Sequence, residues 1–121
     1  MSKKILVVED QEDNRRILRD LLTSVGHDML EVEDGEAAIA AAKQYRPDLI
    51  LMDIQLPVMD GYEATRRIKA DPELRAIPII VVTSYALSGD EDKARLSGCD
   101  AYVAKPYSPR ELLAKINSYL K

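Results

Sequence analysis

The chain has 121 residues, a length that suits one domain spanning 1–121, and 46% of the residues are apolar. No apolar run approaches the ~20 residues of a membrane span, and the first four residues lead directly into a strand-like run, leaving no room for a signal peptide. A single cysteine, Cys99, excludes an internal disulfide and favours a reducing compartment, here the cytoplasm. The net charge of −4 argues against nucleic acid as a direct ligand.

Short apolar runs alternate with amphipathic helical patterns along the chain. The first run is apolar throughout, which indicates a strand buried on both faces, whereas the alternating second run is typical of an edge strand. The predicted strands are Ile5–Val8, Asp28–Val32, Leu49–Met52, Ile79–Val82 and Ala101–Ala104.

Each predicted strand is followed by a predicted helix. Gly26 closes the first helix, and Ser108 opens the last as an N-cap, followed by Pro109 and by Glu111 at the third helical position. The predicted helices are Asn14–Val25, Gly35–Tyr45, Tyr62–Ala70, Ser88–Leu96 and Pro109–Leu120. This order predicts the α/β class, with five βα units forming a doubly wound parallel sheet covered on both faces. Periodicity alone does not give the strand order.

Polar side chains follow four of the predicted strands at the points where the strands end. Because the carboxyl ends of parallel strands share one edge, these residues should meet in one crevice. Three acids, a hydroxyl and an ammonium group can together hold a divalent cation and receive a phosphoryl group. The residues are Glu9, Asp10, Asp53, Thr83 and Lys105.

Each of these residues also has a purely structural interpretation. Asp10 can cap the helix that follows, with Asp13 adding charge to its first turn, and Thr83 is an ordinary β-branched strand residue. Lys105 can be a surface lysine, and Tyr102 a half-buried strand aromatic. Chance would rarely place all of these polar residues at the ends of predicted strands.

The spacing and flanking residues resemble the receiver domain of two-component response regulators over nearly the whole chain. The most specific stretch runs from Pro47-Asp48 through the apolar strand to Asp53, and on to Met59-Asp60-Gly61. This resemblance implies the flavodoxin-like strand order 2-1-3-4-5 and a single receiver domain without an output domain.

The resemblance also implies a role for each site residue. Asp53 would be the phosphoacceptor, and Mg²⁺ would be held by Asp10, Asp53 and the main-chain carbonyl of Gln55, with Glu9 acting through water. The phosphoryl-binding residues would be Thr83, Ser84 and Lys105, with a cis peptide bond between Lys105 and Pro106. Thr83 and Tyr102 would form the switch, and Gln55 and Tyr85 would tune the phosphoryl lifetime.

The function implied by the resemblance is phosphorylation-controlled protein binding. A sensor histidine kinase would donate the phosphoryl group, and a downstream protein would bind the face formed by Ser88–Leu96, Ala101–Ala104 and Ser108–Leu120. Within the family, the chain is most similar to single-domain regulators that modulate kinases in bacterial cell-cycle and polarity circuits. A shuttle that passes phosphate to a histidine phosphotransfer protein is equally compatible.

Two other classes fit less well. A phosphohydrolase with an aspartyl nucleophile would carry a second Asp two residues after Asp53, where this chain has Gln55. A flavin carrier would need a hydroxyl- or Gly-rich phosphate loop after the first strand, where Gln11-Glu12-Asp13 would repel phosphate. Cys99 and the lone His27 match no zinc or Cys/His spacing, and His27 is expected to be solvated in its turn. The sequence therefore predicts a signalling switch and not an enzyme.

Overall fold

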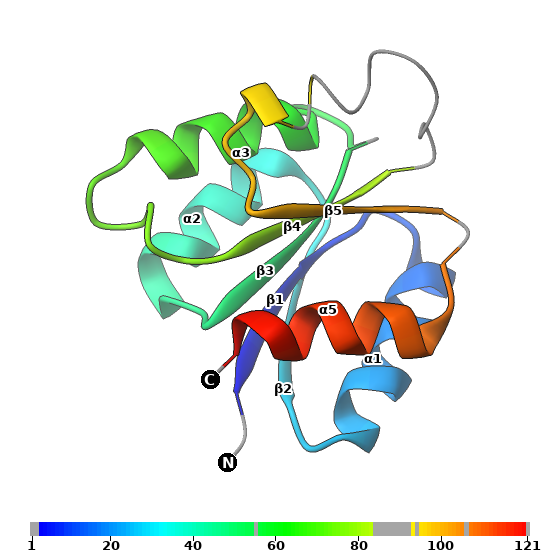
Figure 1. Cartoon of the computed structure of the whole chain (residues 1–121). Coiled ribbons are helices and arrows are strands. Elements are labelled where there is room, and N and C mark those ends of the chain that lie inside the picture. Colours follow the sequence, from blue (N-terminus) through cyan, green and yellow to red (C-terminus); the bar gives the residue numbers. More distant parts are fainter. Residues whose placement is uncertain (1–2, 55, 84–92, 94, 106, 121) are drawn as a thin grey trace.

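A computed structural model describes residues 3–54, 56–83, 93, 95–105 and 107–120. Its strands are all paired in parallel, in the order β2-β1-β3-β4-β5 (Figure 1). They are β1 (Lys4–Val8), β2 (Asp28–Val32), β3 (Leu49–Asp53), β4 (Ile79–Thr83) and β5 (Ala101–Ala104). The predicted fold class and strand order are confirmed, and β2 is an edge strand as its alternating pattern indicated.

The helices are α1 (Glu12–Ser24), α2 (Gly35–Tyr45), α3 (Gly61–Ala70) and α5 (Pro109–Tyr119). Three of them begin at a side-chain cap that accepts a hydrogen bond from the third helical N–H: Asp34 for α2, Asp60 for α3 and Ser108 for α5. The helix predicted at Ser88–Leu96 lies largely outside the described residues, although Lys93, Arg95 and Leu96 are helical.

The start of α1 differs from the prediction. The helix begins at Glu12, two residues before the predicted Asn14, and its N-cap is Gln11, which makes no side-chain capping bond. Asp10 is therefore not the cap of this helix. A second difference concerns His27. Its Nδ1 is buried and has no hydrogen-bond partner among the described residues, so the prediction of a solvated ring was wrong for that nitrogen.

The sheet separates two apolar clusters, and alternate strand residues belong to opposite faces (Figure 1). Under α2 and α3 the cluster includes Leu6, Val8, Ile50, Met52, Ala38 and Ile68. Under α1 and α5 it includes Ile5, Val7, Leu49, Leu51, Leu22 and Ile116. Continuing the alternation by one step puts the side chains of Glu9 and Asp53 on the α1 and α5 side, at the carboxyl edge of the sheet.

Candidate functional site

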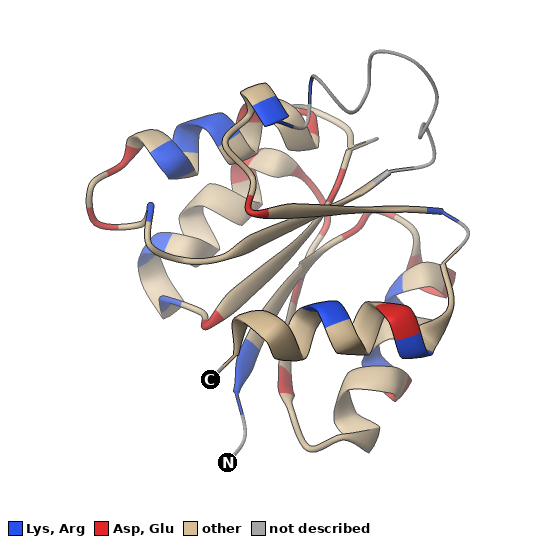
Figure 2. Ribbon diagram, viewed as in Figure 1, with Lys and Arg blue, Asp and Glu red and all other residues tan. Residues whose placement is uncertain are grey.

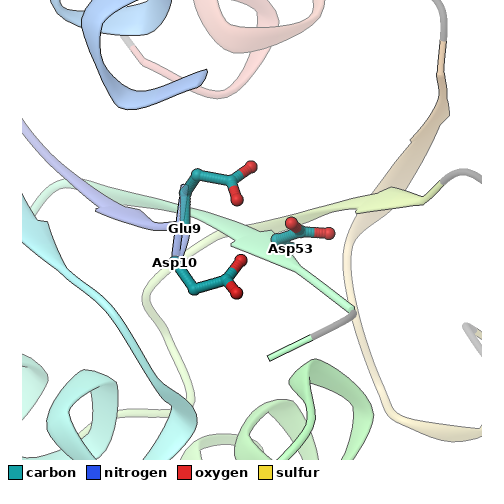
Figure 3. Close-up of side chains that lie close together, drawn as sticks. All are labelled: Glu9, Asp10 and Asp53. Carbon is teal, nitrogen blue, oxygen red and sulfur yellow. The ribbon is translucent and has the colours of Figure 1, made fainter. Parts of the chain in front are cut away.

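The carboxyl ends of β1 and β3 bring three acidic side chains together. Val8 and Met52 are partners in the last register pair of these neighbouring strands, so Glu9, Asp10 and Asp53 follow at the same edge. One carboxylate oxygen from each of the three lies within 4.8 Å of the others. Figure 3 shows the Glu9 and Asp10 side chains reaching from the end of β1 toward Asp53. These three residues are called the acidic site below.

Two of these acids are nearly removed from solvent. The exposed fraction is 3% for Glu9 and 7% for Asp53, although acidic residues are rarely buried without a partner. Burial and, second, the negative charge of Asp53 raise the pKa of Glu9 from 4.5 to about 7. The site therefore carries an electrostatic cost that a bound cation would relieve.

One positive charge approaches the acidic site from β5. The Lys105 ammonium lies 3.5 Å from Glu9 Oε1 and 3.4 Å from Asp53 Oδ2, which are long distances for charge-assisted bonds. In Figure 2 the ribbon is blue, the colour of Lys and Arg, at the end of β5, and red at the ends of β1 and β3. Lys105 therefore lies within ion-pair distance of two of the three acids, and its loose contacts leave the ammonium able to meet a further anionic group.

The loop after β3 is fitted closely against the strand end that carries Asp53. Asp53 Oδ1 accepts a hydrogen bond from the Ile54 N–H at 2.7 Å, and the Gly61 N–H donates to the Ile54 carbonyl at 3.0 Å. A Cβ added at Gly61 would collide with the main-chain oxygen of Asp53, and one at Gly35 with that of Met59. The start of α3 therefore rests on the backbone of the strand that positions Asp53.

The remaining predicted residues are only partly described. Thr83 ends β4 beside Ala104 in the β4–β5 register, which puts its backbone at the same edge as Asp53. Tyr102 lies in β5, half-buried, and packs against the cluster under α2 and α3. Four predicted positions lie outside the described residues: Gln55, Ser84, Tyr85 and Pro106.

A groove of about 530 Å³ opens beside the acidic site, between α1 and the start of α5. Glu9 and Lys105 line it, and its mostly apolar walls include Ile17 of α1, which is 58% exposed. Its other lining residues are Asn14, Leu18, Val82, Tyr107 and Pro109. Burial raises the pKa of the Tyr107 phenol, so the tyrosine remains neutral at the groove wall.

Sequence reasoning missed one charged residue that contacts the site. Arg15 in α1 donates from Nη1 to the main-chain oxygen of Glu9 at 2.8 Å. Its side chain is only 12% exposed and also approaches acids of α1, β2 and the residue after β2. No local pattern identifies this role, because the bond to Glu9 spans the turn between β1 and α1, and the contacts with Glu31 and Glu33 depend on β1 and β2 being neighbours in the sheet.

The donor set of the acidic site matches the chemistry of a small divalent cation. Mg²⁺ prefers oxygen ligands in octahedral geometry and is usually held by one or two carboxylates together with water and phosphate oxygens. Three converging carboxylates, two of them buried, provide such ligands. The residues present therefore fit the predicted magnesium ion.

A model of the response regulator receiver domain matches residues 5–117, and the chain belongs to this family. It is 46% identical over 120 residues to the polar-differentiation response regulator DivK of Brucella anthropi. The aligned region covers 99% of this chain and 98% of DivK. The resemblance to the receiver family is confirmed. The DivK relative also agrees with the expected similarity to single-domain regulators of polarity circuits. The chain is thus a two-component signalling receiver of the DivK type.

Two solved structures extend the comparison. The receiver domain of the sensor histidine kinase PA1611 from Pseudomonas aeruginosa PAO1 is 39% identical, with a TM-score of 0.92 and 98% of both chains covered, and it has a magnesium ion in its active site cleft. The phosphorylated cyanobacterial phytochrome response regulator RcpA is 31% identical, with a TM-score of 0.84, covering 98% of this chain and 91% of RcpA. In the described part of the chain, every helix is too short or too polar to cross a bilayer.

Proposed function

We propose that this receiver accepts a phosphoryl group on Asp53 from a phosphohistidine, with Mg²⁺ bound at the acidic site. The observation that carries the proposal is the convergence of Glu9, Asp10 and Asp53 with the loosely held Lys105. Magnesium in the cleft of the PA1611 receiver and phosphorylation of RcpA support the same chemistry in related chains. The protein acts as a switch in the cytoplasm, not as an enzyme on external substrates.

Each described residue has a defined task in the transfer. Oδ1 of Asp53 is held by the Ile54 N–H, which leaves Oδ2 to attack phosphorus. The new bond is Oδ2–P, the P–N bond of the phosphohistidine breaks, and the imidazole nitrogen keeps the electron pair. A bound Mg²⁺ supplies positive charge for the phosphoryl oxygens. Lys105, already 3.4 Å from Oδ2, meets one of those oxygens once the acyl phosphate forms.

The groove beside the acidic site gives a donor protein access to Asp53. Its lining includes Glu9 and Lys105 of the site and the exposed Ile17. An apolar wall next to the reacting groups suits the apolar face of a helix from the donor protein, a histidine kinase or a histidine phosphotransfer protein. Donation by a kinase and exchange with a phosphotransfer protein use the same geometry.

The test of this function is direct labelling of the protein. Incubation with acetyl phosphate and Mg²⁺ should add one phosphoryl group, and mass spectrometry after borohydride trapping should locate it at Asp53. Labelling should fall to background in EDTA. A label on a different residue, or none with any small phosphodonor or purified kinase, would contradict the proposal.

The output face is proposed to be formed by Ser88–Leu96, β5 and the helix from Ser108 to Leu120. β5 links this face to the site, because Tyr102 lies within this strand and Lys105 directly follows it. Phosphorylation would draw Thr83 toward the phosphoryl group and let Tyr102 change its packing, so that a partner protein selects one of two states.

NMR of the free and beryllofluoride-bound protein tests this output face. Amide shifts should extend from Asp53 into residues 84–107, and Thr83→Ala or Tyr102→Ala should retain phosphorylation while shortening that extension. Shifts confined to the neighbourhood of Asp53 in the wild type would rule out the face without affecting the phosphoacceptor assignment.

A further inference from the structure

We propose that Arg15 is a positioning residue that fixes the Glu9–Asp10 segment in the geometry required for metal binding. The inference rests on the proposed metal site and adds a residue to it. Arg15 comes from the second turn of α1, and its Nη1 donates to the Glu9 carbonyl at 2.8 Å. Its side chain is 12% exposed, so the guanidinium is held among its partners and does not move freely in solvent.

The hydrogen bond from Arg15 lies where the pairing of β1 and β2 ends. The Glu9 N–H still donates to the Val32 carbonyl at 3.0 Å. If the parallel pairing continued, the Glu9 carbonyl would accept the next hydrogen bond from the backbone that follows β2. It accepts one from the Arg15 side chain instead. The same guanidinium lies 3.4 Å from Glu31 and 3.7 Å from Glu33, the residues on either side of Val32. Arg15 therefore continues the connection between β1 and β2 one step past the sheet.

This connection acts on the metal site through the peptide that follows. The carbonyl of Glu9 and the N–H of Asp10 belong to one planar peptide unit, so fixing the carbonyl fixes where the Asp10 side chain starts. Asp10 is one of the three converging carboxylates, and the Glu9 carboxylate begins on the other side of the same bond. Partners that orient metal ligands in this way raise affinity by reducing the disorder that binding must remove.

The positive charge of Arg15 is offset by the acids that surround it. Glu12 lies at 2.6 Å, and Glu31 and Glu33 lie at 3.4 and 3.7 Å. Three carboxylates offset one guanidinium, so its net repulsion of a cation at the acidic site is small. Loss of the hydrogen bond to Glu9 should therefore outweigh loss of the positive charge, and removal of Arg15 should weaken metal binding.

Arg19, one turn further along α1, provides a matched control. It binds Glu12 at 3.3 Å and Glu31 at 2.6 Å, two of the acids that Arg15 also contacts. Among the described residues, its hydrogen bonds go to these two glutamates and not to the backbone of Glu9. The two arginines thus share a helix, a charge and two acidic partners. Arg15 differs in its bond to Glu9, in its contact with Glu33 and in being more buried, at 12% exposed against 37% for Arg19.

The experiment compares Mg²⁺ affinity by isothermal titration calorimetry in the wild type, Arg15→Met and Arg19→Met. Arg15→Met should weaken Mg²⁺ binding roughly tenfold or more, the usual effect of losing a residue that orients a metal ligand. Arg19→Met should change it by less than about twofold, because an exposed charge is strongly screened. Labelling of Arg15→Met by acetyl phosphate should recover at saturating Mg²⁺, since the nucleophile is intact.

A second variant and a second readout keep the test decisive if Arg15→Met folds poorly. Arg15→Lys keeps the charge but lacks the fork that reaches Glu9 and the glutamates together. Its Asp10 amide resonance should shift in the metal-free protein and its Mg²⁺ affinity should fall, with neither change in Arg19→Lys. Wild-type affinity in both Arg15 variants would overturn the inference. A wild type that does not bind Mg²⁺ would instead overturn the proposed metal site.

Discussion

Two groups of three carboxylates adjoin each other at the start of α1, and they differ in the positive charge that meets them. One group, called the paired cluster here, has two guanidinium groups at 2.6–3.7 Å and consists of Glu12, Glu31 and Glu33 with Arg15 and Arg19. In the acidic site, the one ammonium group within ion-pair distance among the described residues is that of Lys105, at 3.4–3.5 Å.

The contrast shows which acids serve structure and which serve binding. In the paired cluster Glu12 and Glu31 each have a cation at 2.6 Å, and all three acids are at least partly exposed, so the arrangement is weakly stabilising and satisfied without a ligand. In the acidic site, burial of Glu9 and Asp53 strengthens repulsion that Lys105 offsets only in part. A bound cation, alone or together with a phosphoryl group, would balance the negative charge of the acidic site. The paired cluster already holds two guanidinium groups and would gain nothing from such a ligand.

The largest expected effect comes from breaking the acidic site at its nucleophile. Asp53→Asn should abolish labelling by acetyl phosphate, because an amide keeps the shape of the side chain but cannot attack phosphorus. The variant should remain folded by circular dichroism. Asp13→Asn, an exposed acid of α1, is the control and should be labelled like the wild type. Full labelling of Asp53→Asn would remove Asp53 from its proposed role.

Next in size is the effect of neutralising one acid on the free energy of unfolding. Like charges ~4 Å apart repel by roughly 4 kcal/mol at an effective dielectric constant of about 20, before solvation reduces this. Asp10→Asn should therefore stabilise the metal-free protein, by about 1–2 kcal/mol after that reduction. Mg²⁺ should stabilise the wild type by mass action and have little effect on the variant.

Urea unfolding of both proteins in EDTA and in millimolar Mg²⁺ measures these differences. Identical wild-type curves under the two conditions would mean that the three carboxylates do not form a metal site.

A smaller effect is expected from pH. The pKa of Glu9 is raised in the folded state to about 7 from 4.5, so between these values the folded protein binds more protons than the unfolded one. The stability that Glu9 contributes is therefore present at low pH and is lost as pH rises through about 7. In EDTA, the melting temperature of the wild type should fall more between pH 5 and pH 7.5 than that of Glu9→Gln. Parallel pH profiles for the two proteins would contradict the raised pKa.

The smallest expected effect belongs to the paired cluster and has the opposite sign. Glu31→Gln removes an acid bound by Arg19 at 2.6 Å and by Arg15 at 3.4 Å, and should destabilise the protein by about 0.5–1 kcal/mol at low salt. High salt should reduce the loss, because these side chains are partly exposed. Measured beside Asp10→Asn, this variant sharpens the comparison. If both variants shifted stability in the same direction, the two groups would not differ as described.

Much of the fold could be predicted because its signals are local. The bounds of α2, β2 and β5 are as predicted, and a side-chain cap, Asp34, marks the start of α2. α1 begins earlier than predicted because its cap, Gln11, makes no side-chain bond and so leaves no signal in the sequence. The burial of His27 Nδ1 was missed for a related reason, since it depends on packing around a turn.

The grouping of the site's side chains was predictable from the sequence, but the residues that support them were not. Glu9, Asp53 and Lys105 each follow an apolar run, and the rule that parallel strands end at one edge was enough to bring them together. The contact of Arg15 with the Glu9 carbonyl joins residues six apart through a turn and a helix. Its acidic partners Glu31 and Glu33 depend on β2 lying beside β1, which periodicity does not reveal.

The close seating of Gly61 on the Asp53 backbone has a consequence for mutational tolerance. A saturation library selected for signalling should deplete every substitution at Gly61, including alanine, because the first added carbon meets a main-chain oxygen. Gly26 has open space around its Cβ position but a φ of +86°, so asparagine should be accepted there more readily than valine. In such a map Gly61 would look like a catalytic position, although its constraint comes from the fit between α3 and β3.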